Sequence, residues 1–296
     1  MSKKISDKDF LLVRLPNGEY SLRSISYGET FHPVVGPVTE ARSLYLKQLN
    51  LAERISKCQN EFVIWDVGLG AAANPVSILE CSKNLTTPLR IISFDYTIEP
   101  LEFALQHTSE LQYLKGWENI LYTLIQTHRV SFINGKQPVV WEFHKGDFPS
   151  MLNQFLRLPS SNKLPAPCSI FYDAYSPKTN PQMWTLSVFK NLYALLDPSI
   201  PCSLATYSRS TLIRATLLLS GFFVGIGNAT GEKEETTIAA NRIDLIPVLL
   251  DKRWLFRAKR STSAHPLINA EYIQKPISSE IFDQLLAHPQ FAHQPI

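Results

Sequence analysis

The hydrophobic positions of the chain fall into short continuous runs that alternate with segments of helical periodicity. Nearly unbroken apolar runs occupy residues 62–68, 90–96, 168–176 and 201–208, as is typical of strands buried on both faces. Helical spacing appears between them, at residues 75–84, 99–127, 148–158, 181–196 and 210–221. Strands that alternate with helices predict a mainly parallel sheet covered on both faces, a doubly wound α/β fold.

The two ends of the chain follow other patterns. Apolar runs on either side of Pro16-Asn17-Gly18 predict a β-hairpin, and a helix is expected from Thr39, a plausible N-cap, to residue 55. Strand-like runs flank Asn134-Gly135, and residues 222–229 and 236–241 form a terminal strand pair with no helix between them, which predicts an antiparallel edge. The periodicity ends near Ile246. We therefore expect an accessory segment at 1–55, the main domain at 56–245 and an irregular C-terminal extension at 246–296.

Composition narrows the class of protein. With 45% hydrophobic and 19% charged residues, the chain has a globular composition, and its net charge of +3 neither requires nor excludes a nucleic-acid partner. The four cysteines show no C-x-x-C spacing, so we expect free thiols and no metal site. No signal-peptide pattern opens the sequence and no apolar run reaches the ~20 residues of a membrane span. A cytoplasmic protein with no membrane contact is expected, and nothing in the sequence indicates its oligomeric state.

A glycine-containing segment, Asp66-Val67-Gly68-Leu69-Gly70-Ala71-Ala72-Ala73-Asn74, lies where a buried strand turns into a helix. Small residues let the backbone approach a ligand there, and the start of the helix offers free N–H groups. Ligands of open α/β sheets bind at the carboxyl ends of strands. The alternative is a tight turn that binds nothing.

Two acidic residues follow later strands in the order that a nucleotide site requires. Asp95 ends the second strand, 25 residues after Gly70, where a carboxylate commonly binds a ribose. Asp147 follows Gly146 and either contacts a ligand, caps the helix that begins near Phe148, or does both.

The most specific motif is Asp173-Ala-Tyr-Ser-Pro-Lys-Thr-Asn-Pro-Gln-Met-Trp184, directly after a buried strand. It resembles the D-x-F-[AS]-P-x-x-N-P-x-M-W signature of the MnmC-like methyltransferases, which act on the wobble uridine of certain bacterial tRNAs. The glycine segment, the strand ends at Asp95 and Asp147, and residues 204–208 occur in the same order as in that family, and the resemblance extends from Glu19 to Asn241.

The resemblance implies a Rossmann-like, seven-stranded methyltransferase fold with an N-terminal β-hairpin, and S-adenosylmethionine as the cofactor. It implies methylation of an aminomethyl group on tRNA, without the FAD-dependent oxidoreductase domain of some members. The expected cofactor-binding residues are Asp66, Gly68, Gly70, Asn74, Asp95, Asp147 and Asp173. Asp173 is also expected to be catalytic, by orienting the amine and accepting its proton, and the acceptor is expected to contact Tyr175, Pro177 and Asn180. Met183 and Trp184 are expected to pack in the core.

Several alternatives stay open at this point. Ala72 replaces a glycine frequent in the family and is compatible with the loop if its φ is negative. A different RNA or a small-molecule acceptor would use the same fold, and a relative that binds RNA or a partner without catalysis is the other alternative. His32 could lie near the site. The basic cluster of Lys252, Arg253, Arg257, Lys259 and Arg260, interleaved with Trp254 and Phe256, indicates either nucleic-acid contact or a solvated tail whose aromatic residues cover the edge of the core.

Overall fold

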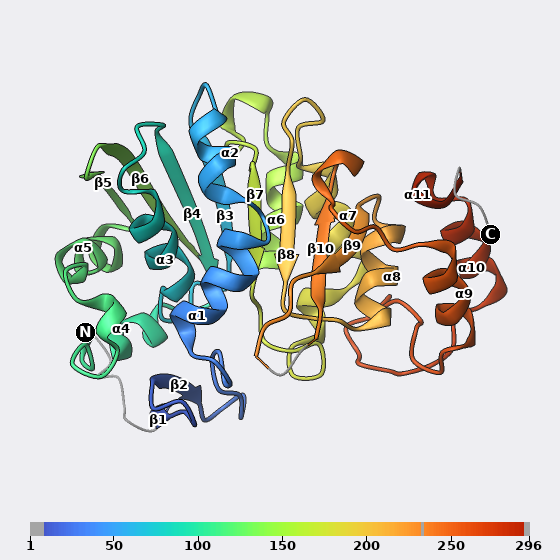
Figure 1. Cartoon of the computed structure of the whole chain (residues 1–296), viewed down its shortest axis with the longest axis horizontal. Coiled ribbons are helices and arrows are strands. Elements are labelled where there is room, and N and C mark those ends of the chain that lie inside the picture. The colour runs from blue at the N-terminus through green and yellow to red at the C-terminus, as the bar shows by residue number, and fades with distance from the viewer. Residues whose placement is uncertain (1–8, 232–233, 293–296) are drawn as a thin grey trace.

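The centre of the protein is a sheet of eight strands in the order β5-β6-β4-β3-β7-β8-β10-β9 (Figure 1). The computed structural model describes residues 9–231 and 234–292. Strands β3, β4, β6, β7 and β8 are parallel, whereas β5 and β10 pair antiparallel with their neighbours. The strands are β3 (Phe62–Val67), β4 (Leu89–Asp95), β5 (Arg129–Asn134), β6 (Gln137–Lys145), β7 (Ser169–Tyr172), β8 (Ser203–Thr206), β9 (Phe223–Gly227) and β10 (Thr236–Ala240). The predicted doubly wound α/β fold, its antiparallel edge and the two strand-like runs around Asn134-Gly135 are confirmed, and the sheet has one strand more than the seven-stranded fold that the resemblance implies.

Helices cover both faces of the sheet and bury it. All six residues of β3 are buried, and they alternate between two hydrophobic clusters: Phe62 and Ile64 face one, Val63 and Trp65 the other. The first cluster contains residues of α1 (Pro37–Ala41), a π-helical turn (Arg42–Lys47), α2 (Leu51–Lys57), α3 (Ala73–Ser82), α4 (Glu99–Leu105) and α5 (Glu118–Thr127). The second contains residues of α6 (Phe148–Arg157), α7 (Leu186–Ala194) and α8 (Thr211–Leu219). Short 3₁₀ turns occupy Gln112–Leu114, Ser160–Asn162, Pro181–Trp184 and Ile243–Leu245.

The N-terminal segment forms the predicted hairpin, but its helix is not continuous. Strands β1 (Phe10–Arg14) and β2 (Tyr20–Ser24) pair antiparallel. The expected single helix from Thr39 to residue 55 is wrong, because the helical path begins at Pro37 after an N-cap at Gly36 and breaks at Asn50, whose φ is +48°. Apolar spacing runs through both pieces, so periodicity does not reveal a break that a single left-handed residue makes.

Two other helical regions divide in the same way. The expected helical region 99–127 separates into α4, a 3₁₀ turn and α5, with Gly116 at φ +86° before α5. The region 181–196 becomes a 3₁₀ turn followed by α7, whose N-cap Thr185 accepts a hydrogen bond from the N–H of Val188. Side-chain capping thus sets the start of α7 five residues after the predicted start.

The C-terminal residues are more regular than predicted. Instead of an irregular extension they form α9 (Lys252–Arg260), α10 (Ser279–Leu286) and α11 (Pro289–Ala292), which lie beyond α8 at one end of the molecule (Figure 1). Trp254, Phe282 and Phe291 insert into the second hydrophobic cluster. In α9 five basic residues outnumber the four apolar ones, and α10 and α11 have only eight and four residues, so no apolar period stands out in the sequence.

Residues 9–231 and 234–292 contain no helix long and apolar enough to cross a membrane. Over the same ranges, no group of three or more histidine, cysteine, aspartate or glutamate side chains is arranged to hold a metal ion.

Candidate functional site

A cavity of about 1040 Å³ opens at the carboxyl ends of the parallel strands. It lies where the strand order reverses, because β4 follows β3 on one side whereas β7 pairs with β3 on the other. The loops after β3, β4, β6 and β7 all contribute to its walls. A cavity of this size at a topological switch point is the usual ligand site of an open α/β sheet.

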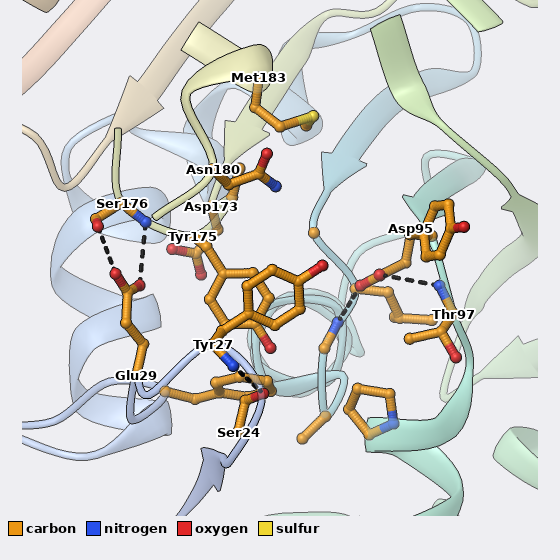
Figure 2. A pocket seen from close by; sticks show the side chains of 18 of the residues that line it. Ser24, Tyr27, Glu29, Asp95, Thr97, Asp173, Tyr175, Ser176, Asn180 and Met183 are labelled. Atoms are coloured by element: carbon orange, nitrogen blue, oxygen red, sulfur yellow. Dashed lines mark hydrogen bonds between the residues drawn. The ribbon is translucent and has the colours of Figure 1, made fainter. Parts of the chain in front are cut away.

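The loop after β3 approaches the loop after β7 very closely. Gly68 has φ +99°, and a Cβ atom at this position would lie 2.6 Å from the carbonyl oxygen of Asp173. Gly70 has φ +50°, and its N–H donates a hydrogen bond of 3.0 Å to Oδ2 of Asp95. Gly68 and Gly70 line the cavity, as do Asp95 and Asp173, which Figure 2 labels. The backbone conformation therefore favours glycine at both positions. At Gly68 the close approach to Asp173 also leaves no room for a side chain.

Ala72 does not meet the condition under which alanine fits this loop without strain. Its φ is +60°, not negative, and it is the left-handed N-cap of α3. In this left-handed conformation the Cβ atom of an L-residue lies too close to the following carbonyl oxygen, which costs roughly 1–2 kcal/mol. Ala72 is buried but does not line the cavity.

Ala72→Gly is expected to raise the free energy of unfolding by about 1 kcal/mol, because glycine adopts this conformation without the steric cost. Chemical denaturation of the two proteins measures the difference. Ala73→Gly, which places the same change inside the first turn of α3, is the matched control and is expected to destabilise by about the same amount. A loss of stability in Ala72→Gly would contradict the strain at this position.

Asp173 lies at the centre of a small polar cluster. Its Oδ2 accepts a 2.8 Å hydrogen bond from Nδ2 of Asn74 and lies 3.8 Å from Nε2 of His32. The other ring nitrogen of His32 lies 3.8 Å from Oε2 of Glu40. His32 adopts φ +47°, an unusual conformation that tends to occur at functional sites. The structure thus brings His32, whose role the sequence left open, next to Asp173.

The structure places Asp66 away from the cavity. Asp66 is fully buried in β3, and its Oδ2 accepts a 2.7 Å hydrogen bond from Oγ of Ser93 on β4. It is absent from the cavity lining, so the structure does not bring Asp66 together with the other residues expected to bind the cofactor. Burial raises the pKa of the Asp66 carboxyl well above its ordinary value.

A raised folded-state pKa makes ionised Asp66 a cost to stability, one that grows as pH rises from the ordinary carboxyl range through the folded-state value. Asp66→Asn is therefore expected to gain stability relative to the parent protein as pH rises, and to keep its affinity for the ligand of the cavity. Thermal unfolding between pH 4 and pH 9 measures the first effect. A variant whose relative stability falls with rising pH, or whose ligand affinity drops tenfold, would argue against this assignment.

The residues expected to contact the acceptor divide into two that line the cavity and one that does not. Tyr175 lines it and stacks on Tyr27 with ring centroids 4.2 Å apart, and burial raises the pKa of its phenol. Asn180 also lines it, and its buried Oδ1 has no hydrogen-bond partner among the described residues. Pro177 does not line the cavity. Met183 is buried as expected but also borders the cavity.

Asp95 and Asp147 lie on the side of the cavity formed by β4 and β6. Burial raises the pKa of the Asp95 carboxyl, an effect opposed by its hydrogen bonds from the N–H groups of Gly70 and Thr97. Asp147 lines the cavity and also caps α6, since its side chain accepts the N–H of Ser150. The position of Asp147 is therefore compatible with both predicted roles, a ligand contact and the cap of α6.

The segment after the N-terminal hairpin closes one side of the cavity. Glu29 accepts hydrogen bonds from the N–H and the hydroxyl of Ser176 (Figure 2). It also accepts one from the hydroxyl of Thr179. The ring of Phe31 lies against Gly70 and 5.7 Å from that of Tyr175. Sequence reasoning missed these residues, because no local pattern connects them to a loop almost 150 positions away.

Comparisons with known proteins agree with this geometry. Residues 151–242 match a family described as S-adenosyl-L-methionine-dependent methyltransferase. The bifunctional protein MnmC of tRNA 5-methylaminomethyl-2-thiouridine biosynthesis is 26% identical in Aeromonas hydrophila over 249 residues, which cover 79% of this chain and 36% of that protein. Its counterpart in Leptospira interrogans is 26% identical over 71% of this chain and 32% of its own length. The chain thus spans about a third of the length of these curated relatives.

A solved structure reproduces the fold over nearly the whole chain. The crystal structure of MnmC2 from Aquifex aeolicus superposes with a TM-score of 0.68 and covers 94% of this chain and 84% of its own, at 19% sequence identity. At this identity the likeness concerns the fold, whereas the family match and the curated relatives bear on the chemistry. The resemblance that the Asp173–Trp184 motif predicts is confirmed: residues 151–242 match the S-adenosyl-L-methionine-dependent methyltransferase family, and the chain is similar to the MnmC proteins over most of its length.

Proposed function

We propose that the protein transfers a methyl group from S-adenosylmethionine to the amino group of an aminomethyl substituent on the wobble uridine of tRNA. The observation that carries the proposal is the placement of Asp173, the first residue of the most specific sequence motif, in the wall of the cavity. The curated relatives, whose name refers to tRNA 5-methylaminomethyl-2-thiouridine biosynthesis, support the choice of acceptor. We further propose that residues 56–245 hold the catalytic domain, that 1–55 and 246–296 are accessory, and that the protein acts in the cytoplasm.

The residues of the cavity fit a cofactor with a charged amino-acid end and a nucleoside end. Gly68 and Gly70 leave room beside the backbone, and Asn74 Oδ1 is buried without a partner among the described residues, as expected of an atom that awaits a ligand donor. Together they would hold the methionine portion. Asp95 would accept hydrogen bonds from the ribose and Asp147 from the adenine amino group, next to the ring of Phe148.

When bound, S-adenosylmethionine supplies a methyl group on a positively charged sulfur, so the protein mainly has to position the acceptor. The acceptor amine must lose a proton to be nucleophilic. Oδ2 of Asp173 is held by Asn74, and the carboxylate orients the amine and accepts this proton. His32 is the nearest basic group to this carboxylate: its Nε2 lies 3.8 Å from Oδ2 of Asp173, and its Nδ1 lies 3.8 Å from Oε2 of Glu40. Both separations are longer than a hydrogen bond.

The direct test uses tRNA isolated from cells that make the aminomethyl uridine but do not methylate it. Incubation with the purified protein and S-adenosylmethionine, followed by mass spectrometry of the digested nucleosides, is expected to show the wobble nucleoside heavier by one methylene unit. tRNA that already carries the methyl group is the control and should not change.

The same assay, combined with binding titrations of S-adenosylmethionine and tRNA, separates the alternatives. If the protein binds S-adenosylmethionine but leaves this tRNA unchanged, the acceptor is another RNA or a small amine, and assays with total RNA and with pooled metabolites identify which. If it binds tRNA and not the cofactor, the non-catalytic reading replaces the proposal.

A further inference from the structure

We propose that the exposed face of α9 is a binding surface for the phosphate backbone of the tRNA whose wobble base enters the cavity. This inference rests on the proposed function for the identity of the RNA, and on α9 itself for the surface. Helix α9 lies outside residues 151–242, the part of the chain that matches the methyltransferase family.

Positive charge is concentrated in this helix. Residues 251–260 contain five lysines and arginines and one acidic residue, Asp251, so their net charge is +4. The whole chain has a net charge of +3, which leaves −1 for all other residues together. A nearly neutral protein with one strongly basic helix has a localised site for an anionic partner.

The arginines of α9 share one face. Arg253, Arg257 and Arg260 follow the i, i+4, i+7 spacing, are exposed, and line a common shallow hollow with Lys252, Phe256 and the N-cap Asp251. None of the three arginines forms an ion pair with any residue in the described ranges, and like charges at this spacing repel one another. A row of phosphates would relieve this repulsion and accept hydrogen bonds from the guanidinium groups.

The packing of the opposite face favours RNA over a lipid surface. Trp254, Leu255 and Ala258 are buried in the second hydrophobic cluster, and Nζ of Lys259 lies 4.1 Å from the centroid of the Phe282 ring. A membrane-bound amphipathic helix needs its apolar face free to enter the bilayer. The apolar face of α9 is used within the fold, which leaves a charged face suited to phosphates.

The position of α9 suits a partner much larger than the cavity. Figure 1 shows α9 at one end of the molecule, outside α8, whereas the hairpin β1–β2, which contributes residues to the cavity lining, lies below α1. A tRNA with one base in the cavity extends far beyond it, and contacts to its backbone would position the molecule without reading its sequence.

The test compares the parent protein with Arg253→Gln/Arg257→Gln/Arg260→Gln in fluorescence-anisotropy titrations of a labelled tRNA transcript with a wobble uridine. The matched control is Lys57→Gln/Lys83→Gln/Lys136→Gln, which removes the same charge from exposed positions near the amino ends of the strands. At about 0.1 M salt the arginine variant should bind at least tenfold more weakly, and the slope of log affinity against log salt should fall by about 2–3. The control should stay within about threefold of the parent.

Titration with S-adenosylmethionine, expected to give the parent affinity in both variants, shows that the fold is intact. The inference is overturned if the arginine variant loses no more tRNA affinity than the control, or if vesicles containing phosphatidylserine bind the parent and not the arginine variant. A parent protein that binds tRNA through α9 but does not methylate it would contradict the proposed function and leave the α9 surface standing, so the two failures are distinguishable.

Discussion

Asp173→Asn is expected to lower the rate of methyl transfer by about 10² to 10⁴-fold while the affinity for S-adenosylmethionine stays within about threefold. Asparagine has the same shape as aspartate, and its carbonyl oxygen still accepts the hydrogen bond that Asn74 donates at 2.8 Å. It cannot accept a proton from the amine. Single-turnover kinetics at saturating tRNA and cofactor, together with a cofactor titration, separate the two effects.

His32→Gln is the control for this variant, because it removes the imidazole 3.8 Å from Asp173 and leaves the carboxylate in place. His32→Gln should lower the rate of methyl transfer by about tenfold, less than Asp173→Asn, which removes the group that accepts the proton. Asp173→Asn with cofactor affinity reduced as much as turnover would instead make Asp173 a cofactor ligand or a structural residue.

Gly68→Ala is expected to lower the free energy of unfolding by about 2–4 kcal/mol and to abolish cofactor binding. Its φ of +99° is strained for alanine, and the added Cβ atom would lie 2.6 Å from the Asp173 carbonyl oxygen, so the loops after β3 and β7 must move apart. Denaturant unfolding and calorimetric titration with S-adenosylmethionine measure the two losses.

Gly116→Ala isolates the conformational part of this effect. Gly116 has φ +86°, but a Cβ atom there meets nothing within 4 Å, and the residue does not line the cavity. Gly116→Ala should lower the free energy of unfolding by about 1–2 kcal/mol and leave cofactor binding intact. If Gly68→Ala and Gly116→Ala lost the same stability and the same cofactor affinity, the close approach of Gly68 to Asp173 would have no role in forming the site.

The sheet and the order of its site-bearing loops could be predicted because they depend on local patterns. Apolar runs mark β3, β4, β7 and β8, and the glycines and acids at their carboxyl ends converge because parallel strands share an edge. Helix interruptions could not be predicted, since Asn50 and Gly116 leave the apolar period unchanged. The C-terminal helices could not be predicted either, because basic residues dominate α9 and because α10 and α11 are too short to establish a period.

The candidate site was predictable by position but not by side-chain direction. Asp66 stands at the expected strand end, yet its side chain points into the sheet toward Ser93 rather than into the cavity. Pro177 belongs to the motif without lining the cavity. Tyr27 and Glu29 complete the site from the N-terminal segment through contacts that only the folded chain creates. The sequence of a strand shows that successive side chains point to opposite faces of the sheet, but tertiary packing decides which of them reach the ligand.

The central claim, that the cavity between β3, β4 and β7 is the S-adenosylmethionine site, is tested most directly by isothermal titration of the parent protein and of Asp95→Ala with this cofactor. We expect the parent to bind with a dissociation constant on the order of micromolar, and Asp95→Ala to bind at least tenfold more weakly because the ribose hydrogen bonds are lost. No detectable binding by the parent, or equal binding by Asp95→Ala, would contradict the account.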